Sequence, residues 1–296
     1  MKALKGTGIA IVTPFKDNRE VDFEALTQLT HYWISGGVDY LVVLGTTGES
    51  VTLNAEEKMA VLQTVIRANA GRVPLVYGLG GNYTEEIIRQ MKAFNQPDVV
   101  AFLSVTPYYN KPGQEGLKAH YGALAEASPL PILLYNVPGR TGIHMTPETT
   151  LWLAEKYANI IGVKEACGQM EPIMEILRLR RPDFLVISGD DGLTLPLMSV
   201  GADGVISVIA NAYPGLTSQM VKAAMSGNWD LAKSLHFAQL PMIKGLFAEN
   251  SPGGIKAVMA HLGLCNAAVR LPLVSVSSSL QASLVQEANR LRAHHA

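Results

Sequence analysis

The lysine of the segment IIGVKEA is the residue best suited to covalent chemistry. In an extended strand, Lys164 would share one face with Ile160, Gly162 and Ala166. If that face lines the interior of the fold, the amine lies in apolar surroundings, where lysines are rare unless they are paired or functional. Burial disfavours a charged ammonium, and a nucleophile that forms a Schiff base must be the free amine. A lysine that reaches solvent from a strand end explains the segment equally well.

Hydroxyl groups follow other apolar runs of the chain. Tyr135 and the adjacent Tyr108 and Tyr109 end two such runs, and imine formation needs several proton transfers. Thr46 and Thr47 stand in a glycine-flanked turn, which could offer backbone N–H groups and hydroxyls to a carboxylate. Taken alone, each tyrosine is explained more simply as a ring packed in the core. The two threonines are likewise explained more simply as part of an ordinary glycine–threonine turn.

Charged residues complete the candidate chemistry. Arg140 stands five residues after Tyr135 in a proline–glycine loop. An arginine at the mouth of a site can bind a carboxylate through two hydrogen bonds, although a surface ion pair is an equal alternative. Asp190 and Asp191 lack partner ligands for a metal, so we interpret them as acceptors for backbone N–H groups at a helix start.

Eight short apolar runs, separated by stretches of helical length, would carry these residues. Asn54 with Glu57 predicts a capping box, and Thr146 with Pro147 predicts another helix start. Regular alternation of strand and helix predicts a parallel sheet covered by crossover helices. The expected strands are 7–12, 39–44, 74–79, 99–105, 130–135, 160–165, 184–188 and 203–208.

A closed barrel is favoured over an open dinucleotide-binding sheet. The segment GLGGNY has Tyr83 where the third glycine of that fingerprint would stand. We therefore predict an α/β protein with a (β/α)₈ TIM barrel over residues 1–227 and a C-terminal helical domain over 228–296. In such barrels the active site lies at the carboxyl ends of the strands. The polar segments GTTGES, TPYYN, YNVPGRTG, KEA and SGDD all follow or end expected strands.

The composition excludes several other classes of protein. The 296 residues carry a formal net charge of -1, and 17% are charged, so no surface for nucleic acid or a membrane is expected. Two cysteines and seven scattered histidines predict neither a disulfide framework nor a metal site. The first apolar stretch is too short for a signal peptide, and no run reaches the roughly 18 residues of a membrane span. We expect a cytoplasmic protein.

Six linked segments, GTTGES, TPYYN, YNVPGRTG, GVKEA, SGDD and GVISV, resemble the 4-hydroxy-tetrahydrodipicolinate synthase (dihydrodipicolinate synthase) family. This family lies within the superfamily of pyruvate-dependent Schiff-base aldolases and N-acetylneuraminate lyase. The resemblance runs from IVTPF at 11–15 to the C-terminal helices. It implies that pyruvate forms an imine with the lysine of GVKEA, becomes an enamine and attacks L-aspartate 4-semialdehyde, in lysine and diaminopimelate biosynthesis. No cofactor is implied, because the lysine supplies the chemistry.

The resemblance also assigns roles to single residues. It implies that Lys164 is the nucleophile and that Tyr135 exchanges protons at the imine. Thr46 and Tyr109 would complete a hydroxyl relay, with Tyr109 supplied by a neighbouring chain. Thr47 and the backbone of Ile206 would bind pyruvate, and Arg140 the carboxylate of the second substrate. Family members are usually homotetramers built as dimers of dimers.

Two other functions and one regulatory site remain to be weighed. Related barrels cleave sugar acids, but Arg140 favours a small carboxylated aldehyde over a polyol. A barrel that has lost catalysis and only binds is disfavoured because lysine, tyrosines and threonine are all present. The resemblance places a candidate lysine-binding allosteric site at Ser50, Val51, Asn82, Glu86 and Tyr108. Ala55 and Lys58 replace the histidine or aromatic residues of many lysine-sensitive members, so we expect weak inhibition or none.

Overall fold

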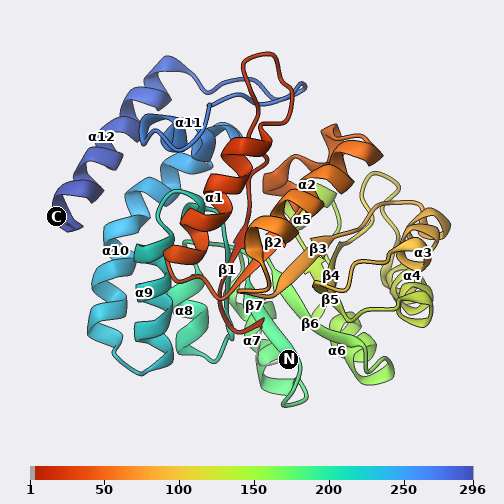
Figure 1. The fold of residues 1–296 in the computed structure, drawn as a ribbon. Coiled ribbons are helices and arrows are strands. Elements are labelled where there is room, and N and C mark those ends of the chain that lie inside the picture. The colour runs from red at the N-terminus through yellow and green to blue at the C-terminus, as the bar shows by residue number, and fades with distance from the viewer. Residues whose placement is uncertain (1–3, 296) are drawn as a thin grey trace.

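A closed barrel of eight parallel strands forms the centre of the computed structural model, which describes residues 4–295 (Figure 1). Each strand pairs with the next one along the chain, and β8 pairs with β1 to close the barrel. Each expected strand overlaps an observed one, so the predicted (β/α)₈ barrel is confirmed. The strands are β1 Gly6–Ala10, β2 Tyr40–Val43, β3 Leu75–Gly78, β4 Val99–Val105, β5 Ile132–Asn136, β6 Ile160–Glu165, β7 Leu185–Ser188 and β8 Gly204–Ser207.

Helices surround the barrel, and α10 to α12 form the C-terminal region beside α9 and α1 (Figure 1). Both predicted helix starts are confirmed. The Asn54 side chain accepts from the Glu57 N–H while Glu57 accepts from the Asn54 N–H, and Thr146 caps the helix that begins at Pro147. The helices are α1 Phe23–Ser35, α2 Ala55–Asn69, α3 Thr84–Ala93, α4 Gln114–Ala127, α5 Pro138–Thr141, α6 Pro147–Lys156, α7 Met170–Leu179, α8 Thr194–Ser199, α9 Pro214–Met225, α10 Trp229–Leu246, α11 Gly253–His261 and α12 Ser278–His295.

Alternation along the strands divides the apolar side chains into two clusters. On β5, Ile132 and Leu134 pack outward against the helices, whereas Leu133 and Tyr135 belong to the cluster that fills the barrel. The interior is thus a packed core. Only its upper layer, at the carboxyl ends of the strands, carries the residues with candidate chemistry.

One detail of the predicted alternation on β6 is wrong. Ile160 packs in the outer cluster, whereas Ile161 belongs to the inner one. The cause is a shift in register, since Ile132 pairs with Ile160 but Leu133 pairs with Gly162. An extra residue of this kind reverses the side-chain alternation locally. Gly162 and Lys164 follow the shift and keep the predicted inward orientation.

Segments far apart in the sequence meet above the barrel. The loop that precedes α1 and the loop that follows α11 lie side by side at the top of Figure 1. Asn266 donates to Asp17 over 2.6 Å, and the Arg270 side chain donates to the Arg19 carbonyl over 3.0 Å. The C-terminal region therefore reaches the end of the barrel at which the strands finish.

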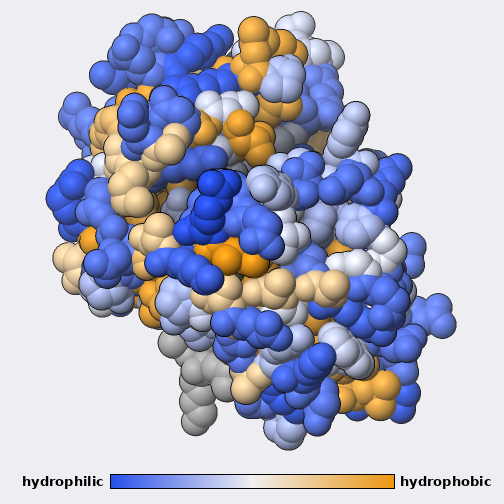
Figure 2. Space-filling model, turned by 90° about the vertical axis from the view of Figure 1, so that its right-hand side faces the viewer, coloured by the Kyte–Doolittle hydropathy of each residue, from blue (hydrophilic) through white to orange (hydrophobic). Residues whose placement is uncertain are grey.

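None of the helices within residues 4–295 combines the length and the apolar character that crossing a bilayer requires. The face that carries α3 and α4 is mainly hydrophilic, with an apolar band across its middle (Figure 2).

Candidate active site

Lys164 and Tyr135 lie side by side inside the upper end of the barrel. They are register partners on β6 and β5, and the Lys164 Nζ atom lies 4.3 Å from the centre of the Tyr135 ring. Lys164 is 5% exposed and Tyr135 is 6% exposed. The parallel register of neighbouring strands brings these two residues together although they are far apart in sequence. An amine and a phenol in one desolvated space can exchange a proton with a bound carbonyl compound.

Gly189, directly after β7, leaves the space that the Lys164 side chain occupies. A Cβ atom at position 189 would lie 2.9 Å from the Lys164 Cε atom and 2.8 Å from the Ala166 Cβ atom. Both distances are shorter than ordinary carbon–carbon contacts, so a side chain here would displace the lysine. No sequence pattern had indicated a role for Gly189. Its position within SGDD, at a strand end, was the only available signal.

The turn after β2 has an unusual backbone that sets the places of Thr46 and Thr47. These residues form a short 3₁₀ helix, η2 (Thr46–Gly48), between Leu44 with φ 61° and Glu49 with φ 51°. Thr47 is buried, while Thr46 is exposed toward the cavity described below. Left-handed conformations are unfavourable for residues other than glycine and are concentrated at functional sites. Within residues 4–295, four of the six non-glycine residues with positive φ lie in two loops at this end of the barrel: Leu44, Glu49, Tyr109 and Lys111.

The loop after β5 carries Arg140 and is held by the buried side chain of Asn136. The side-chain oxygen of Asn136 (Oδ1) accepts from the Met145 N–H over 3.0 Å. The side-chain nitrogen of Asn136 (Nδ2) donates to the Met145 carbonyl over 3.2 Å. The same nitrogen donates to the two carboxyl oxygens of Glu165 over 3.0 and 3.2 Å. Burial raises the pKa of the Glu165 carboxyl to about 7, although hydrogen bonds from Asn136 and Cys167 oppose this rise.

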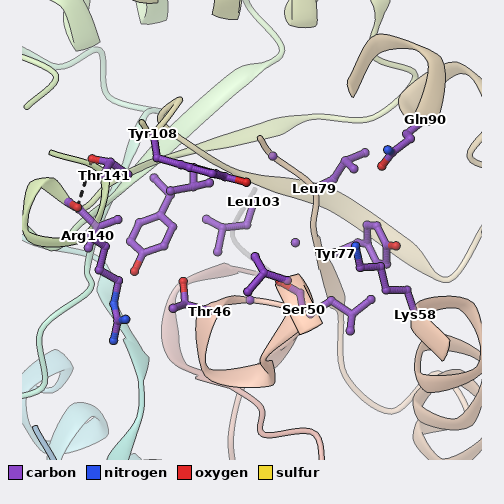
Figure 3. A pocket seen from close by; sticks show the side chains of 18 residues that line it. Thr46, Ser50, Lys58, Tyr77, Leu79, Gln90, Leu103, Tyr108, Arg140 and Thr141 are labelled. Atoms are coloured by element: carbon purple, nitrogen blue, oxygen red, sulfur yellow. Dashed lines mark hydrogen bonds between the residues drawn. The ribbon is translucent and has the colours of Figure 1, made fainter. Parts of the chain in front are cut away.

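A cavity of about 550 Å³ opens between these elements. Thr46, Tyr135 and Arg140 line it, as do Ser50, Val51 and Tyr108 of the candidate allosteric site. In Figure 3, Thr46 and Arg140 lie on one side of the cavity, while Lys58, Tyr77 and Gln90 lie on the other. One continuous space thus connects Thr46 and Tyr135 with part of the candidate regulatory site. Lys164, Thr47 and Ile206 are not among the residues that line it.

The remaining candidates of the allosteric site lie around the cavity without lining it. Asn82 donates to the Tyr108 carbonyl over 3.1 Å. The Glu86 carboxylate, on α3, is bound by the Arg89 guanidinium and accepts from the Gln90 amide over 2.8 Å. The structure therefore brings Ser50, Val51 and Tyr108 together at the cavity, and leaves Asn82 and Glu86 outside its lining.

Tyr109 does not line the cavity of its own chain. It has φ 72° and is 90% exposed, whereas its neighbour Tyr108 lines the cavity. The single chain therefore does not bring Tyr109 to Tyr135. Ile206, on β8, is buried in the inner cluster.

The two aspartates after β7 bind backbone N–H groups. Asp190 accepts from Gly192 over 2.8 Å and from Leu193 over 3.3 Å, just before α8. Asp191 accepts from the N–H groups of Val208 and Ile209 at the start of the 3₁₀ helix η4 (Ile209–Asn211). Both aspartates thus accept backbone N–H groups near helix starts, as expected, but neither is the N-cap residue, which is Leu193 for α8 and Val208 for η4. Among the residues that the structure describes, no three His, Cys, Asp or Glu side chains are grouped as metal ligands.

Comparison with known proteins agrees with this geometry. The model of a family described as the dihydrodipicolinate synthetase family matches residues 3–291. A 4-hydroxy-tetrahydrodipicolinate synthase of Flavobacterium psychrophilum is 49% identical over 95% of this chain and 96% of its own. The structure of a dihydrodipicolinate synthase from Aquifex aeolicus has a TM-score of 0.94 at 37% identity, covering 98% of each chain. A structure from Cyanidioschyzon merolae with lysine bound has a TM-score of 0.94 at 39% identity, covering 98% of this chain and 99% of that one.

Proposed function

The chain belongs to the dihydrodipicolinate synthetase family, and we propose that it condenses pyruvate with L-aspartate 4-semialdehyde through an imine on Lys164. It is a Schiff-base lyase of lysine and diaminopimelate biosynthesis. The observation that carries the role of Lys164 is its position beside Tyr135, where the amine is desolvated and lies 4.3 Å from the ring centre. A nucleophile that forms a Schiff base reacts as the free amine, and the Tyr135 phenol is close enough to exchange protons with the bound carbonyl compound.

The proposed reaction proceeds through an imine and an enamine on Lys164. The Lys164 amine adds to the carbonyl carbon of pyruvate, and loss of water gives the imine. Loss of a proton from the methyl group gives an enamine, whose carbon attacks the aldehyde of the second substrate. The amino group of that substrate then attacks the imine carbon, which closes the ring and releases Lys164. Tyr135 is the group that exchanges protons at the imine.

Three further residues bind the substrates. The Thr47 hydroxyl and the backbone N–H groups of its turn hold the pyruvate carboxylate, and the Ile206 backbone contacts pyruvate from β8. Arg140 lies at the exposed edge of the cavity, where its guanidinium receives the carboxylate of aspartate semialdehyde. These roles place pyruvate toward the inner end and the second substrate toward the mouth of the site.

Tyr109 acts in the site of a second chain. Its 90% exposure and its absence from the lining of its own cavity support this proposal. A relay through Tyr135, Thr46 and Tyr109 needs hydroxyls within roughly 2.6–3.2 Å of one another, and this requires a tight dimer. We place this dimer within a homotetramer, a dimer of dimers, in the cytoplasm. We likewise propose the division of the chain into a barrel domain (1–227) and a helical domain (228–296).

Complementation tests the shared site. Homo-oligomers of Lys164→Ala and of Tyr109→Phe are each expected to be nearly inactive. In a mixed dimer, the Tyr109→Phe chain keeps its lysine and receives an intact tyrosine from its partner, so one complete site forms. Activity should return after the two variants are dissociated and mixed. Verified hybrids without recovery would show that each chain works alone.

Free lysine is expected to inhibit weakly or not at all. Ser50, Val51, Asn82, Glu86 and Tyr108 supply part of a lysine site, but Lys58 adds a positive charge to the lining of the cavity. That charge repels the side chain of the ligand. An activity titration that shows strong inhibition by submillimolar lysine would contradict this expectation.

Borohydride reduction tests the central proposal. In the presence of pyruvate, the reductant should fix one pyruvyl group per chain, on the peptide that contains Lys164. Peptide mass mapping reads the position, and a Lys164→Ala chain is the control. An adduct at another residue, or preferred cleavage of a sugar acid, would refute the proposal.

A further inference from the structure

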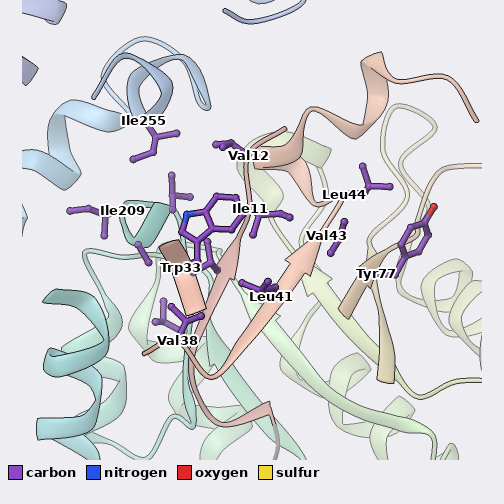
Figure 4. Close-up of a cluster of buried hydrophobic side chains, with 14 of the residues drawn as sticks. Ile11, Val12, Trp33, Val38, Leu41, Val43, Leu44, Tyr77, Ile209 and Ile255 are labelled. Carbon is purple, nitrogen blue, oxygen red and sulfur yellow. The ribbon is translucent and has the colours of Figure 1, made fainter. Parts of the chain in front are cut away.

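Lys256 is a lysine in the interior of the protein, remote in sequence from the residues of the candidate active site. It lies on α11 and is 0% exposed. Figure 4 shows its neighbour Ile255 close to Val12, Trp33 and Ile209, in the core that joins α11 to the barrel. A lysine is almost never fully buried unless it is paired. Its partners therefore indicate why it is there.

Every partner of the Lys256 ammonium is fixed in place. The Nζ atom lies 2.5 Å from a Glu49 carboxyl oxygen and 2.9 Å from the Ala268 carbonyl, and 4.0 Å above the centre of the Phe15 ring. Burial lowers the pKa of Lys256, while the Glu49 carboxylate opposes that change. The second Glu49 oxygen accepts from the backbone N–H of Arg270 over 3.0 Å. Both oxygens of one buried carboxylate are thus bound by the C-terminal region.

Glu49 is part of the turn that carries Thr46 and Thr47. Its backbone N–H donates to the Thr46 carbonyl over 3.0 Å and closes η2. Its own φ of 51° is unfavourable for a residue with a side chain. The anchored carboxylate holds the residue in this conformation. On the other side of the turn, the Thr13 hydroxyl donates to the Gly48 carbonyl over 2.7 Å.

We propose that Lys256 is a positioning residue for pyruvate, because through Glu49 it fixes the turn whose threonines hold the substrate. The inference rests on the proposed role of this turn in binding the pyruvate carboxylate. A buried ion pair stabilises a fold little more than apolar side chains of the same volume. The contribution of Lys256 is to orient Glu49, because the Lys256 ammonium and the Arg270 N–H together determine where the two carboxyl oxygens of Glu49 lie. The C-terminal helical region thereby takes part in substrate binding without contacting the substrate.

Substitution of Lys256 by methionine tests the proposal. The Lys256→Met chain keeps the length of the side chain but leaves Glu49 without its cation. The concentration of pyruvate that half-saturates borohydride trapping at Lys164 should rise about 10- to 100-fold, the scale of a displacement of about 1 Å in a binding group. The KM for aspartate semialdehyde should stay within about twofold, because Arg140 lies on a separately held loop.

A control breaks a partly buried ion pair at the opposite end of the barrel. Asp203, just before β8, is bound by Lys5 and Arg180. Arg180→Met should lower the melting temperature but leave the half-saturating pyruvate concentration within about twofold of the wild-type value, since the pair is remote from the turn. An equal rise in both variants would overturn the proposal, because it would show a general loss of stability.

A double variant keeps the test decisive if Lys256→Met folds poorly. Glu49→Gln combined with Lys256→Met leaves no unpaired charge and should recover the melting temperature. Half-saturation by pyruvate should nevertheless remain raised. Wild-type affinity for pyruvate in either variant would overturn the inference. Absence of a Lys164 adduct in the wild-type chain would instead refute the proposed function, so the two failures are distinguishable.

Discussion

Two loops at the catalytic end of the barrel are both held by buried carboxyl groups, but the partners of these groups differ. Glu49 holds the turn after β2 through an ammonium 207 residues away in sequence. Glu165 supports the loop after β5 through the neutral amide of Asn136, which is 29 residues away. One support therefore comes from the C-terminal region, and the other comes from a neighbouring strand of the barrel.

The difference indicates that the two substrates depend on separate supports. The turn carries the threonines proposed to bind pyruvate, whereas the loop carries the arginine proposed to bind aspartate semialdehyde. Sites with no shared contacts usually respond independently to mutation. A variant in the loop should therefore impair the second substrate alone, as Lys256→Met should impair pyruvate alone.

Removal of Arg140, the cation of the loop after β5, is expected to give the largest difference between the effects on the two substrates. Arg140→Ala should lower kcat/KM for aspartate semialdehyde about 10- to 100-fold, the effect of losing a hydrogen bond between charged groups. Borohydride trapping of pyruvate at Lys164 should be unchanged. Arg140→Lys keeps the positive charge but cannot form two parallel hydrogen bonds to a carboxylate. Its kcat/KM for aspartate semialdehyde should therefore lie between that of the wild-type chain and that of Arg140→Ala. Equal damage to both steps would mean that Arg140 is structural.

Removal of the loop's support should have a smaller effect on the same substrate. Asn136→Ala deletes the hydrogen bonds to Met145 and Glu165, so the Arg140 loop loses its fixed position. We expect the KM for aspartate semialdehyde to rise about tenfold, within the range of a small misplacement. Glu165→Gln retains an acceptor for Asn136 and serves as the control. If pyruvate binding weakens as much as binding of the second substrate, the two supports are not separate.

The third expected effect concerns the pH dependence of stability and leaves substrate binding aside. The pKa of Glu165 is raised from 4.5 to about 7 by burial. Between these values the folded chain holds a proton that the unfolded chain has released, so stability falls as pH rises through this window. Relative to Glu165→Gln, the wild-type chain should lose up to about 3 kcal/mol between pH 4.5 and 7, and then level off.

Thermal unfolding of both chains across this pH range measures the loss. The gap between their melting temperatures should widen by several degrees toward neutral pH. A constant gap would show that Glu165 stays ionised throughout, as a carboxylate with a cationic partner would. The contrast between the two loops would then be lost.

Local patterns were sufficient to predict the barrel. The β-branched runs gave β4 and β6 with their observed bounds, and the other strands to within a few residues. Asn54 with Glu57 and Thr146 with Pro147 specified helix starts, because capping depends on side chains only a few residues apart. The register shift at Ile161 escaped prediction, since one extra residue in a strand leaves no trace in an apolar run.

The site was predictable where its residues stand at strand ends, and not where distant segments meet. Lys164 and Tyr135 follow apolar runs, so the barrel rule alone gathers them at one end. The pairing of Glu49 with Lys256 depends on how α11 packs against the barrel, which no local pattern specifies. A signal was nevertheless present, because Lys256 interrupts an apolar helical segment. Gly189 matters because it has no side chain, and the need for this is evident only from the position of the Lys164 side chain.

The pairing of Glu49 with Lys256 also has a consequence for the order in which the protein matures. A ribosome adds roughly 5–20 residues per second, so the 207 residues between the two partners take roughly 10–40 s to synthesise. During that time the early strands can begin to associate, but the turn that carries Thr46 and Thr47 lacks the Lys256 ammonium proposed to fix it. Nascent or truncated chains that end before α11 would thus contain the proposed nucleophile Lys164 without the proposed substrate site in its finished form. On this proposal, the amine can bind pyruvate specifically only when nearly the whole chain has been made.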